Sequence, residues 1–123
     1  MENGNMKDLY AAQVAFQRLV ESVAGDFPVP FDDPNKFQYH MTAMQEEMGE
    51  VLKADKRWKT HRNETFIPDE KLDEVSDMYI CLFNISIWSG YDFETIMGAV
   101  ANKINVNNER LATRRLNTKA SWE

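Results

Sequence analysis

The sequence predicts an all-α fold with four helices. Apolar residues recur at three- and four-residue spacing in four separate segments, as is typical of helices that bury one face. The segments between them are rich in proline, glycine or polar residues, and no stretch shows the alternation typical of a strand. A chain of 123 residues is long enough for one hydrophobic core, so we expect a single domain over residues 1–123.

A proline-rich segment separates the first two predicted helices. The first helix is expected over residues 7–24, because Gly25 follows it as an end signal. Residues 26–34 carry too many prolines to be helical, but Asp33 before a proline is a good start signal for a second helix over about 34–59. The stripes expected to be buried are Leu9, Ala12, Phe16, Leu19, Val20 and Val23 in the first helix and Phe37, Met41, Met44, Met48 and Val51 in the second.

The third and fourth helices meet at a short turn. The third is expected over about 69–89, with Gly90 after its end, and its residues 79–88 are apolar on nearly all sides. Such a helix belongs in the middle of a bundle or at a subunit interface. Asp92 then caps a fourth helix, whose tail at about 117–123 is expected to fray. The buried stripe expected on this helix is Phe93, Ile96, Val100, Ile104 and Leu111.

Composition narrows the classes of function. The net charge of −6 disfavours nucleic-acid binding, which favours a basic surface. The longest apolar run, residues 78–88, is too short to span a bilayer, so no membrane association is expected. The single Cys81 cannot form an intramolecular disulfide, and the first residues are polar, not like a signal peptide. We therefore expect a cytoplasmic protein.

Two acidic motifs lie on the second and third predicted helices. They are Glu46-Glu47-x-x-Glu50 and Glu74-x-x-Asp77, in which residues three apart share a helix face. If the helices pack together, Glu47, Glu50, Glu74 and Asp77 are gathered in a small volume. Four carboxylates cannot share such a site as bare anions, so either some are protonated or a hard divalent cation, Mg²⁺ or Mn²⁺, neutralises them. We favour the cation; the alternative is two solvated helix faces.

Other metal and nucleotide sites find no support in the sequence. Di-iron bundles use a Glu-x-x-His pair, but neither His40 nor His61 lies three residues after a glutamate. Two histidines and one cysteine are too few for a typical zinc site. No glycine-rich P-loop or dinucleotide-binding loop is present.

Polar residues also form a stripe on the fourth predicted helix. Lys103, Asn107, Arg110 and Arg114 recur at helical spacing. If this stripe faces a metal site, its cations would bind the outer phosphates of a polyphosphate. The alternative, which is commoner for such a stripe, is a basic helix face that contacts only solvent. Trp58, late in the second helix, is either a surface on which a base stacks or a core or interface residue.

Together these motifs resemble the signature of the MazG-like all-α nucleoside triphosphate pyrophosphohydrolases. Residues 46–50, then 73–77 followed by an apolar run, look like the two metal helices of that family. Lys-Arg-Trp58-Lys resembles the end of the first of them, and Lys103-x-x-x-Asn107-x-x-Arg110 resembles the substrate-binding stretch near the C-terminus. The resemblance covers about residues 37–110.

The resemblance implies a fold, an activity and roles for residues. It implies a four-helix bundle of the all-α NTP pyrophosphatase type, assembled as a homodimer or a homotetramer (a dimer of dimers). It also implies Mg²⁺-dependent hydrolysis of an NTP or dNTP to the monophosphate and pyrophosphate, as a house-cleaning of the nucleotide pool. The implied roles are magnesium binding for Glu47, Glu50, Glu74 and Asp77, orientation of the attacking water for Glu46, phosphate and substrate binding for Lys53, Lys103, Asn107 and Arg110, and base or sugar contacts for Phe37, His40 and Trp58.

Two alternatives remain open at this point. One is a catalytically silent helical dimer that binds a protein partner through its third helix and uses magnesium only structurally. The other keeps the chemistry but changes the substrate to dUTP, dCTP or phosphoribosyl-ATP.

Overall fold

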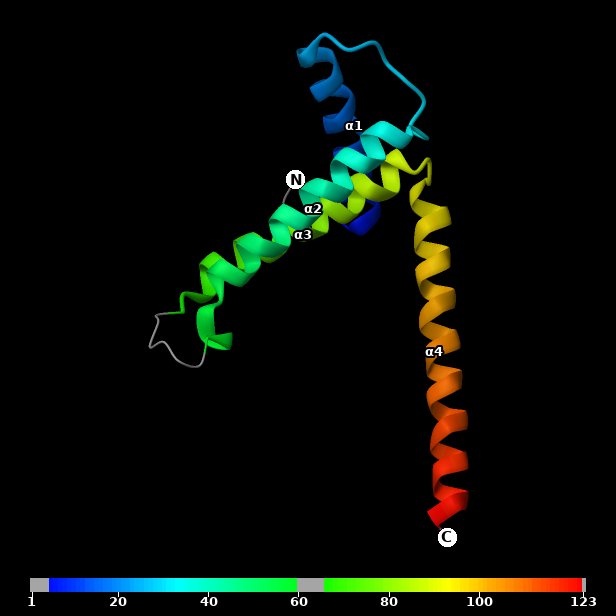
Figure 1. Ribbon diagram of the computed structural model, residues 1–123. Helices are drawn as coiled ribbons and strands as arrows, with labels where there is room; N and C mark the ends of the chain where they lie inside the picture. The colour runs from blue at the N-terminus through cyan, green and yellow to red at the C-terminus, as the bar shows by residue number, and fades with distance from the viewer. Residues whose placement is uncertain (1–4, 60–65, 123) are drawn as a thin grey trace. The chain divides into compact units, whose positions relative to one another are not determined.

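The computed structural model describes residues 5–59 and 66–122, with side chains up to residue 115 in the last helix. Over these ranges the chain forms four α-helices and one short 3-10 helix (Figure 1). The elements are α1 (Met6–Ala24), α2 (Pro34–Ala54), η1 (Lys56–Trp58), α3 (Pro68–Trp88) and α4 (Phe93–Trp122). No β-strand occurs in the described ranges, and the predicted all-α fold is confirmed.

The chain divides into two compact units. Residues 1–91 form the first, with α1, α2 and α3, and residues 92–123 form the second, with α4. The packing of a complete four-helix bundle therefore stays a prediction.

Local capping signals determine where the helices begin and end. Asn5 caps α1 by accepting a hydrogen bond from the Asp8 N–H at 2.9 Å, and Gly25 ends that helix with a φ of 80°. Asp33 caps α2 in the same way, with proline at the first helical position.

The predicted end of α2 near residue 59 is wrong. The helix stops at Ala54, because Asp55 adopts an extended backbone and accepts a hydrogen bond from the Arg57 N–H at 3.1 Å. This side-chain acceptor competes with the helical ladder and starts the separate 3-10 turn η1.

Helices α2 and α3 lie side by side as an antiparallel hairpin (Figure 1). The start of α2 is tied to the end of α3, since the Asp33 N–H donates to the Trp88 carbonyl at 3.3 Å. Gly90 follows α3 with a φ of 83°, and a Cβ atom there would lie 3.1 Å from Cβ of Asp32. Both the positive φ and this close approach require glycine at the turn.

Helix α1 packs against α3 through polar residues. The buried residues of α1 are Tyr10, Gln17 and Glu21. The Trp88 indole N–H donates to Gln17 Oε1 at 3.0 Å, and Gln13 Nε2 donates to Asn84 Oδ1 at 2.8 Å. The contact therefore combines buried amides that are satisfied across the helix pair with the ring of Tyr10, which packs edge to face on Phe83 at 5.5 Å.

The buried stripes predicted for α1 and α2 are wrong for the single chain. All six apolar residues predicted to be buried in α1 are exposed, up to 81% for Val23. None of the residues in α2 is fully buried, and the stripe predicted for α4, in the second unit, stays a prediction. The buried apolar residues in the described ranges are Tyr10, Cys81, Ile87 and Trp88.

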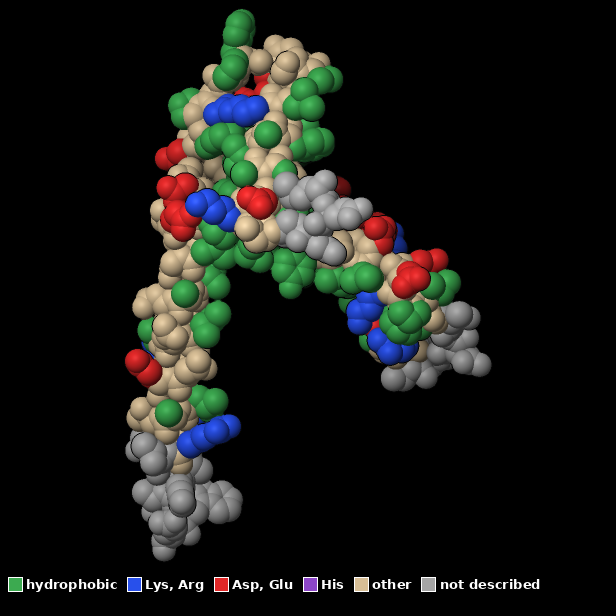
Figure 2. All heavy atoms as spheres, turned by 180° about the vertical axis from the view of Figure 1, so that it is seen from behind, with side chains coloured by type: hydrophobic (Ala, Val, Ile, Leu, Met, Phe, Trp, Pro, Cys, Tyr) green, Lys and Arg blue, Asp and Glu red, His purple; other side chains and the backbone are tan. Residues whose placement is uncertain are grey.

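Helix α3 is apolar on more than one side, as predicted. Cys81, Asn84, Ile87 and Trp88 are buried, whereas Tyr79, Ile80 and Leu82 are exposed on the same helix. Hydrophobic side chains reach the surface along both units (Figure 2). No helix in the described part of the chain combines the length and the apolar character needed to cross a membrane.

Candidate metal centre

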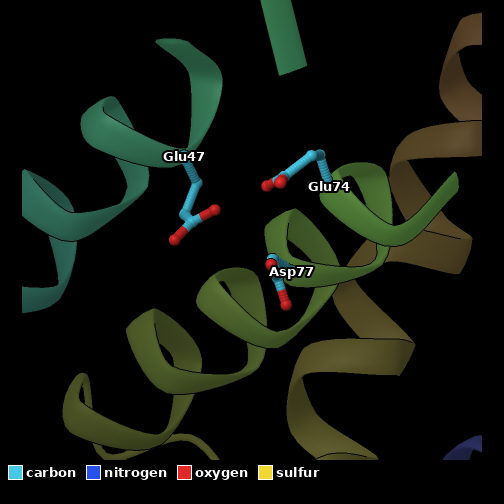
Figure 3. A group of neighbouring side chains, drawn as sticks. All are labelled: Glu47, Glu74 and Asp77. Carbon is cyan, nitrogen blue, oxygen red and sulfur yellow. The ribbon is translucent and has the colours of Figure 1, made fainter. Parts of the chain in front are cut away.

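Three carboxylates meet between α2 and α3. Glu47 projects from α2, and Glu74 and Asp77 project from successive turns of α3 (Figure 3). One carboxylate oxygen from each residue lies within 4.8 Å of the others, and all three side chains are half-buried. The predicted packing of the two acidic motifs is thus present for three of the four carboxylates.

The cluster gathers three carboxylates, and one of their oxygens has no hydrogen-bond donor among the described residues. Glu47 Oε2 is shielded from solvent, and no described residue donates a hydrogen bond to it. The pKa of Glu47 is raised by partial burial first and then by the charges of Asp77, Glu50 and Glu46. The pKa of Glu74 is raised for the same reasons, with burial again the largest cause.

The negative charges of the cluster also act on the buried thiol of Cys81. Cys81 lies one turn beyond Asp77 on α3, and its pKa is raised by burial and then by the charges of Glu47 and Asp77. A raised pKa keeps the thiol protonated near neutral pH. Cys81 is buried beside the cluster, and its sulfur does not belong to the group of ligand atoms that the three carboxylates form.

The fourth predicted ligand is not part of the cluster. Glu50 has 48% of its side chain exposed, and its Oε1 pairs with Lys53 Nζ at 3.4 Å. Glu50 lies three residues after Glu47 on the same helix, but its carboxylate does not belong to the group of ligand atoms that the other three residues form. Its charge still contributes to the raised pKa of Glu47 and Glu74.

Most of the other predicted site residues of the first unit lie apart from the cluster. Glu46 is exposed on the neighbouring face of α2, and Lys53 is 76% exposed in its pair with Glu50. Phe37 and His40 are half-buried near the start of α2, where the His40 ring stacks on Trp88 with centroids 6.4 Å apart.

Trp58 lies at the other end of α2, in η1. Its side chain is 58% exposed, and its indole N–H donates to the Leu52 carbonyl at 3.1 Å. It borders a cavity of about 550 Å³ that Asp55, Arg57 and Lys71 also line. Both cations pair with Asp55, at 2.6 and 2.9 Å, and their hydrogen bonds hold the pKa of that carboxyl well below its usual range. These cations are thus already balanced within the chain.

The predicted basic stripe lies on α4, in the second unit. Lys103, Asn107 and Arg110 are all exposed there. Their role in binding phosphates stays a prediction.

Sequence patterns missed a second group of residues near the turn between α3 and α4. Among the most buried side chains of the described residues are Gln17, Glu21 and Trp88. The first two are polar residues of α1, whose apolar residues the sequence pattern predicts to be the buried ones. Trp88 at the end of the apolar run was the one local signal of a buried site there.

Comparison with known proteins gives no further assignment: no family model, curated protein or solved structure matches this chain.

The donor set itself fits a hard divalent cation. Mg²⁺ prefers oxygen ligands and keeps open positions for water or phosphate when it is held by a few carboxylates. Glu47, Glu74 and Asp77 offer only oxygen donors, and His40, the histidine among the described residues, does not belong to this cluster. The unpartnered Glu47 Oε2 is an atom that such an ion would satisfy.

Proposed function

We propose that the chain is a Mg²⁺-dependent nucleotide pyrophosphohydrolase that cleaves an NTP or dNTP to the monophosphate and pyrophosphate. The observation that supports this most strongly is the cluster of Glu47, Glu74 and Asp77, in which a shielded carboxylate oxygen has no partner among the described residues. The resemblance of residues 37–110 to the MazG-like pyrophosphohydrolases links this donor set to phosphate chemistry.

The proposed metal ligands come from two helices. Glu47 from α2 and Glu74 and Asp77 from α3 would hold Mg²⁺, or Mn²⁺ in its place, so the ligand geometry depends on the packing of the hairpin. When bound, the ion supplies charge neutralisation of phosphate oxygens and a lowered pKa of bound water. Glu50, next to the cluster and paired with Lys53, would join as a ligand after a change of rotamer.

Residues outside the cluster would orient the water and the substrate. Glu46 is exposed beside Glu47 and is the candidate for positioning the attacking water. Lys53, Lys103 and Arg110 would neutralise the leaving pyrophosphate, with Asn107 on the same stripe as the last two. Phe37, His40 and Trp58 are the candidates for contacts with base and sugar.

Assembly into a homodimer or a homotetramer is part of this proposal. The apolar stripe of α1 and the exposed Tyr79, Ile80 and Leu82 of α3 leave more hydrophobic surface uncovered than a small monomer usually shows. A second copy of the chain would cover these faces and enlarge a core that has only four buried apolar residues in the described part of one chain. Light scattering at micromolar concentration tests this, and a stable monomer would contradict it.

Pyrophosphate release is the direct test of the activity. The purified chain is incubated with each ribo- and deoxyribonucleoside triphosphate, with dUTP and with phosphoribosyl-ATP, in the presence of Mg²⁺ or of EDTA. We expect equal amounts of monophosphate and pyrophosphate from at least one substrate, only with the metal. No turnover of any of them, together with metal binding, would instead support the silent helical dimer in which magnesium is structural.

A further inference from the structure

A second unpartnered carboxylate oxygen lies at the opposite end of the hairpin. Glu21 is 3% exposed, and its Oε1 accepts a hydrogen bond from Arg18 at 2.7 Å. Its Oε2 is shielded from solvent, and no described residue donates to it. A buried carboxylate oxygen without a donor is destabilising, so the native structure needs an explanation for it.

Glu21 borders a cavity of about 480 Å³ between α1, the start of α2 and the end of α3. This volume is within the range of small-molecule sites, roughly 300–1,000 Å³. Four aromatic side chains line the cavity: Phe16, Tyr39, His40 and Trp88. The His40 and Trp88 rings are parallel to within 7°, and Tyr39 meets His40 edge to face at 5.0 Å.

The charges around the cavity already balance. Lys36 Nζ lies 3.6 Å from an Asp26 oxygen and 5.1 Å from the centre of the Trp88 ring, and Arg18 pairs with Glu21. Two cations and two anions leave no net charge for an anionic or a doubly charged ligand to neutralise. The lining also offers the side-chain oxygens of Gln17 and Asn35, but both of its carboxylates, Glu21 and Asp26, already pair with cations, which disfavours a hard metal ion there.

We propose that this cavity binds a planar nitrogen heterocycle that carries an amino group, such as adenine or cytosine, with the amino N–H on Glu21 Oε2. The aromatic walls provide surfaces on which a flat ring stacks. The amino group provides the donor that the buried oxygen lacks. This site is separate from the carboxylate cluster, since His40 and Glu47 are two turns, or about 10 Å, apart along α2.

The heterocycle has two possible sources, namely a free nucleoside or the base of a nucleotide whose phosphates reach the carboxylate cluster. The binding itself does not depend on the proposed hydrolysis, so it is measured first without metal. The two sources are then distinguished by the effect of Mg²⁺ on the binding of ATP and of adenosine.

A matched pair of probes isolates the amino group. Adenosine and purine riboside differ only in that group, and both are titrated into the full chain while the indole N–H signal of Trp88 is followed by NMR. We expect adenosine to bind at least about tenfold more tightly, because a hydrogen bond to a buried charged acceptor gives that order of discrimination. Glu21→Gln should reduce this preference to a few-fold, whereas Glu70→Gln, at an exposed glutamate of α3, should leave it unchanged.

Tyr39→Ala serves as a second variant that does not disturb the core, since Tyr39 is 70% exposed. It should weaken both nucleosides equally, because it removes a wall and not the carboxylate. Mg²⁺ that tightens ATP but not adenosine identifies the base of a nucleotide at the metal cluster; equal affinities with and without Mg²⁺ identify a separate ligand. Equal affinities of adenosine and purine riboside for the wild type, or an unshifted Trp88 signal at saturation, would overturn the proposal.

Discussion

Two shielded carboxylate oxygens lie near opposite ends of the α2–α3 hairpin, in different surroundings. One is Glu47 Oε2 on α2 and the other is Glu21 Oε2 on α1, and no described residue donates a hydrogen bond to either of them. Glu47 lies among further carboxylates, and their repulsion contributes to the raised pKa of Glu47 and of Glu74. Glu21 lies instead beside Arg18 and near aromatic rings.

The comparison shows that the residues around an unsatisfied oxygen determine which kind of ligand it favours. Excess negative charge with oxygen donors favours a small hard cation, because only a cation relieves the repulsion. A neutral surrounding with aromatic walls favours an organic N–H donor, because the missing interaction there is a single hydrogen bond. The two ends should therefore respond differently to the same kinds of substitution.

The largest expected effect is on turnover at the carboxylate end. Asp77→Asn should lower kcat/KM by about a hundredfold or more with Mg²⁺, because it removes a charged ligand. The metal-free melting temperature should hold or rise, since one source of like-charge repulsion disappears. Pyrophosphate release and thermal unfolding measure the two quantities.

Asp73→Asn is the matched control for that substitution. It makes the same chemical change on the same helix, but Asp73 is exposed and outside the cluster. Similar losses of turnover in both variants would show that charge on α3, and not ligation by Asp77, determines the activity.

The next effect is on stability at the aromatic end. Trp88 is 1% exposed and donates its indole N–H to the buried Gln17. Trp88→Ala should lower the free energy of unfolding by about 3–5 kcal/mol, because it creates a cavity in a small core and leaves Gln17 Oε1 without its donor. Urea unfolding measures this, and a cost below about 1 kcal/mol would contradict the packing described for the end of α3.

The smallest expected effect is on the pH dependence of stability. Carboxyl groups with a raised folded pKa stabilise the fold when they are protonated, and that contribution is lost as the pH rises through the folded pKa. For Glu47 and Glu74 the window begins near the ordinary value of 4.5 and extends upward toward the raised values. In the metal-free protein these two groups should raise the melting temperature near pH 5 relative to pH 8, and His40 opposes them, because its lowered pKa makes protonation of its ring destabilising.

Acidification also reduces the magnitude of the net charge of −6, and the weaker repulsion between like charges stabilises the fold at lower pH as well. The variant Glu47→Gln separates the two causes, because it removes one of the raised groups and should show a shallower rise than Glu21→Gln. Equal slopes in these two variants would mean that the carboxylate cluster does not contribute to the pH dependence.

The sequence predicts the helices well because their boundaries depend on neighbouring residues. Asn5, Asp33 and Asp92 each cap a helix by accepting a hydrogen bond from the N–H three residues later, and the sequence signals described above predict the last two of these caps. The end of α2 was missed because the competing acceptor, Asp55, is an ordinary helix-surface residue by pattern alone.

Which face of a helix is buried depends on distant residues and was predicted poorly. Gln17 is buried because it accepts from Trp88, 71 positions away in the chain, and no local periodicity contains that information. The same limit applies to the site: spacing predicts the approach of Glu47 to Glu74 and Asp77, but it does not predict that Glu50 pairs with Lys53 and stays outside the cluster.

Calorimetric titration of Mn²⁺ into the nucleotide-free wild type, Glu47→Gln and Glu21→Gln tests the central distinction most directly. We expect the wild type and Glu21→Gln to bind the ion with equal affinity and Glu47→Gln to bind it at least about tenfold more weakly. Equal affinity in all three proteins, or a loss confined to Glu21→Gln, would contradict the assignment of the metal to the cluster of Glu47, Glu74 and Asp77.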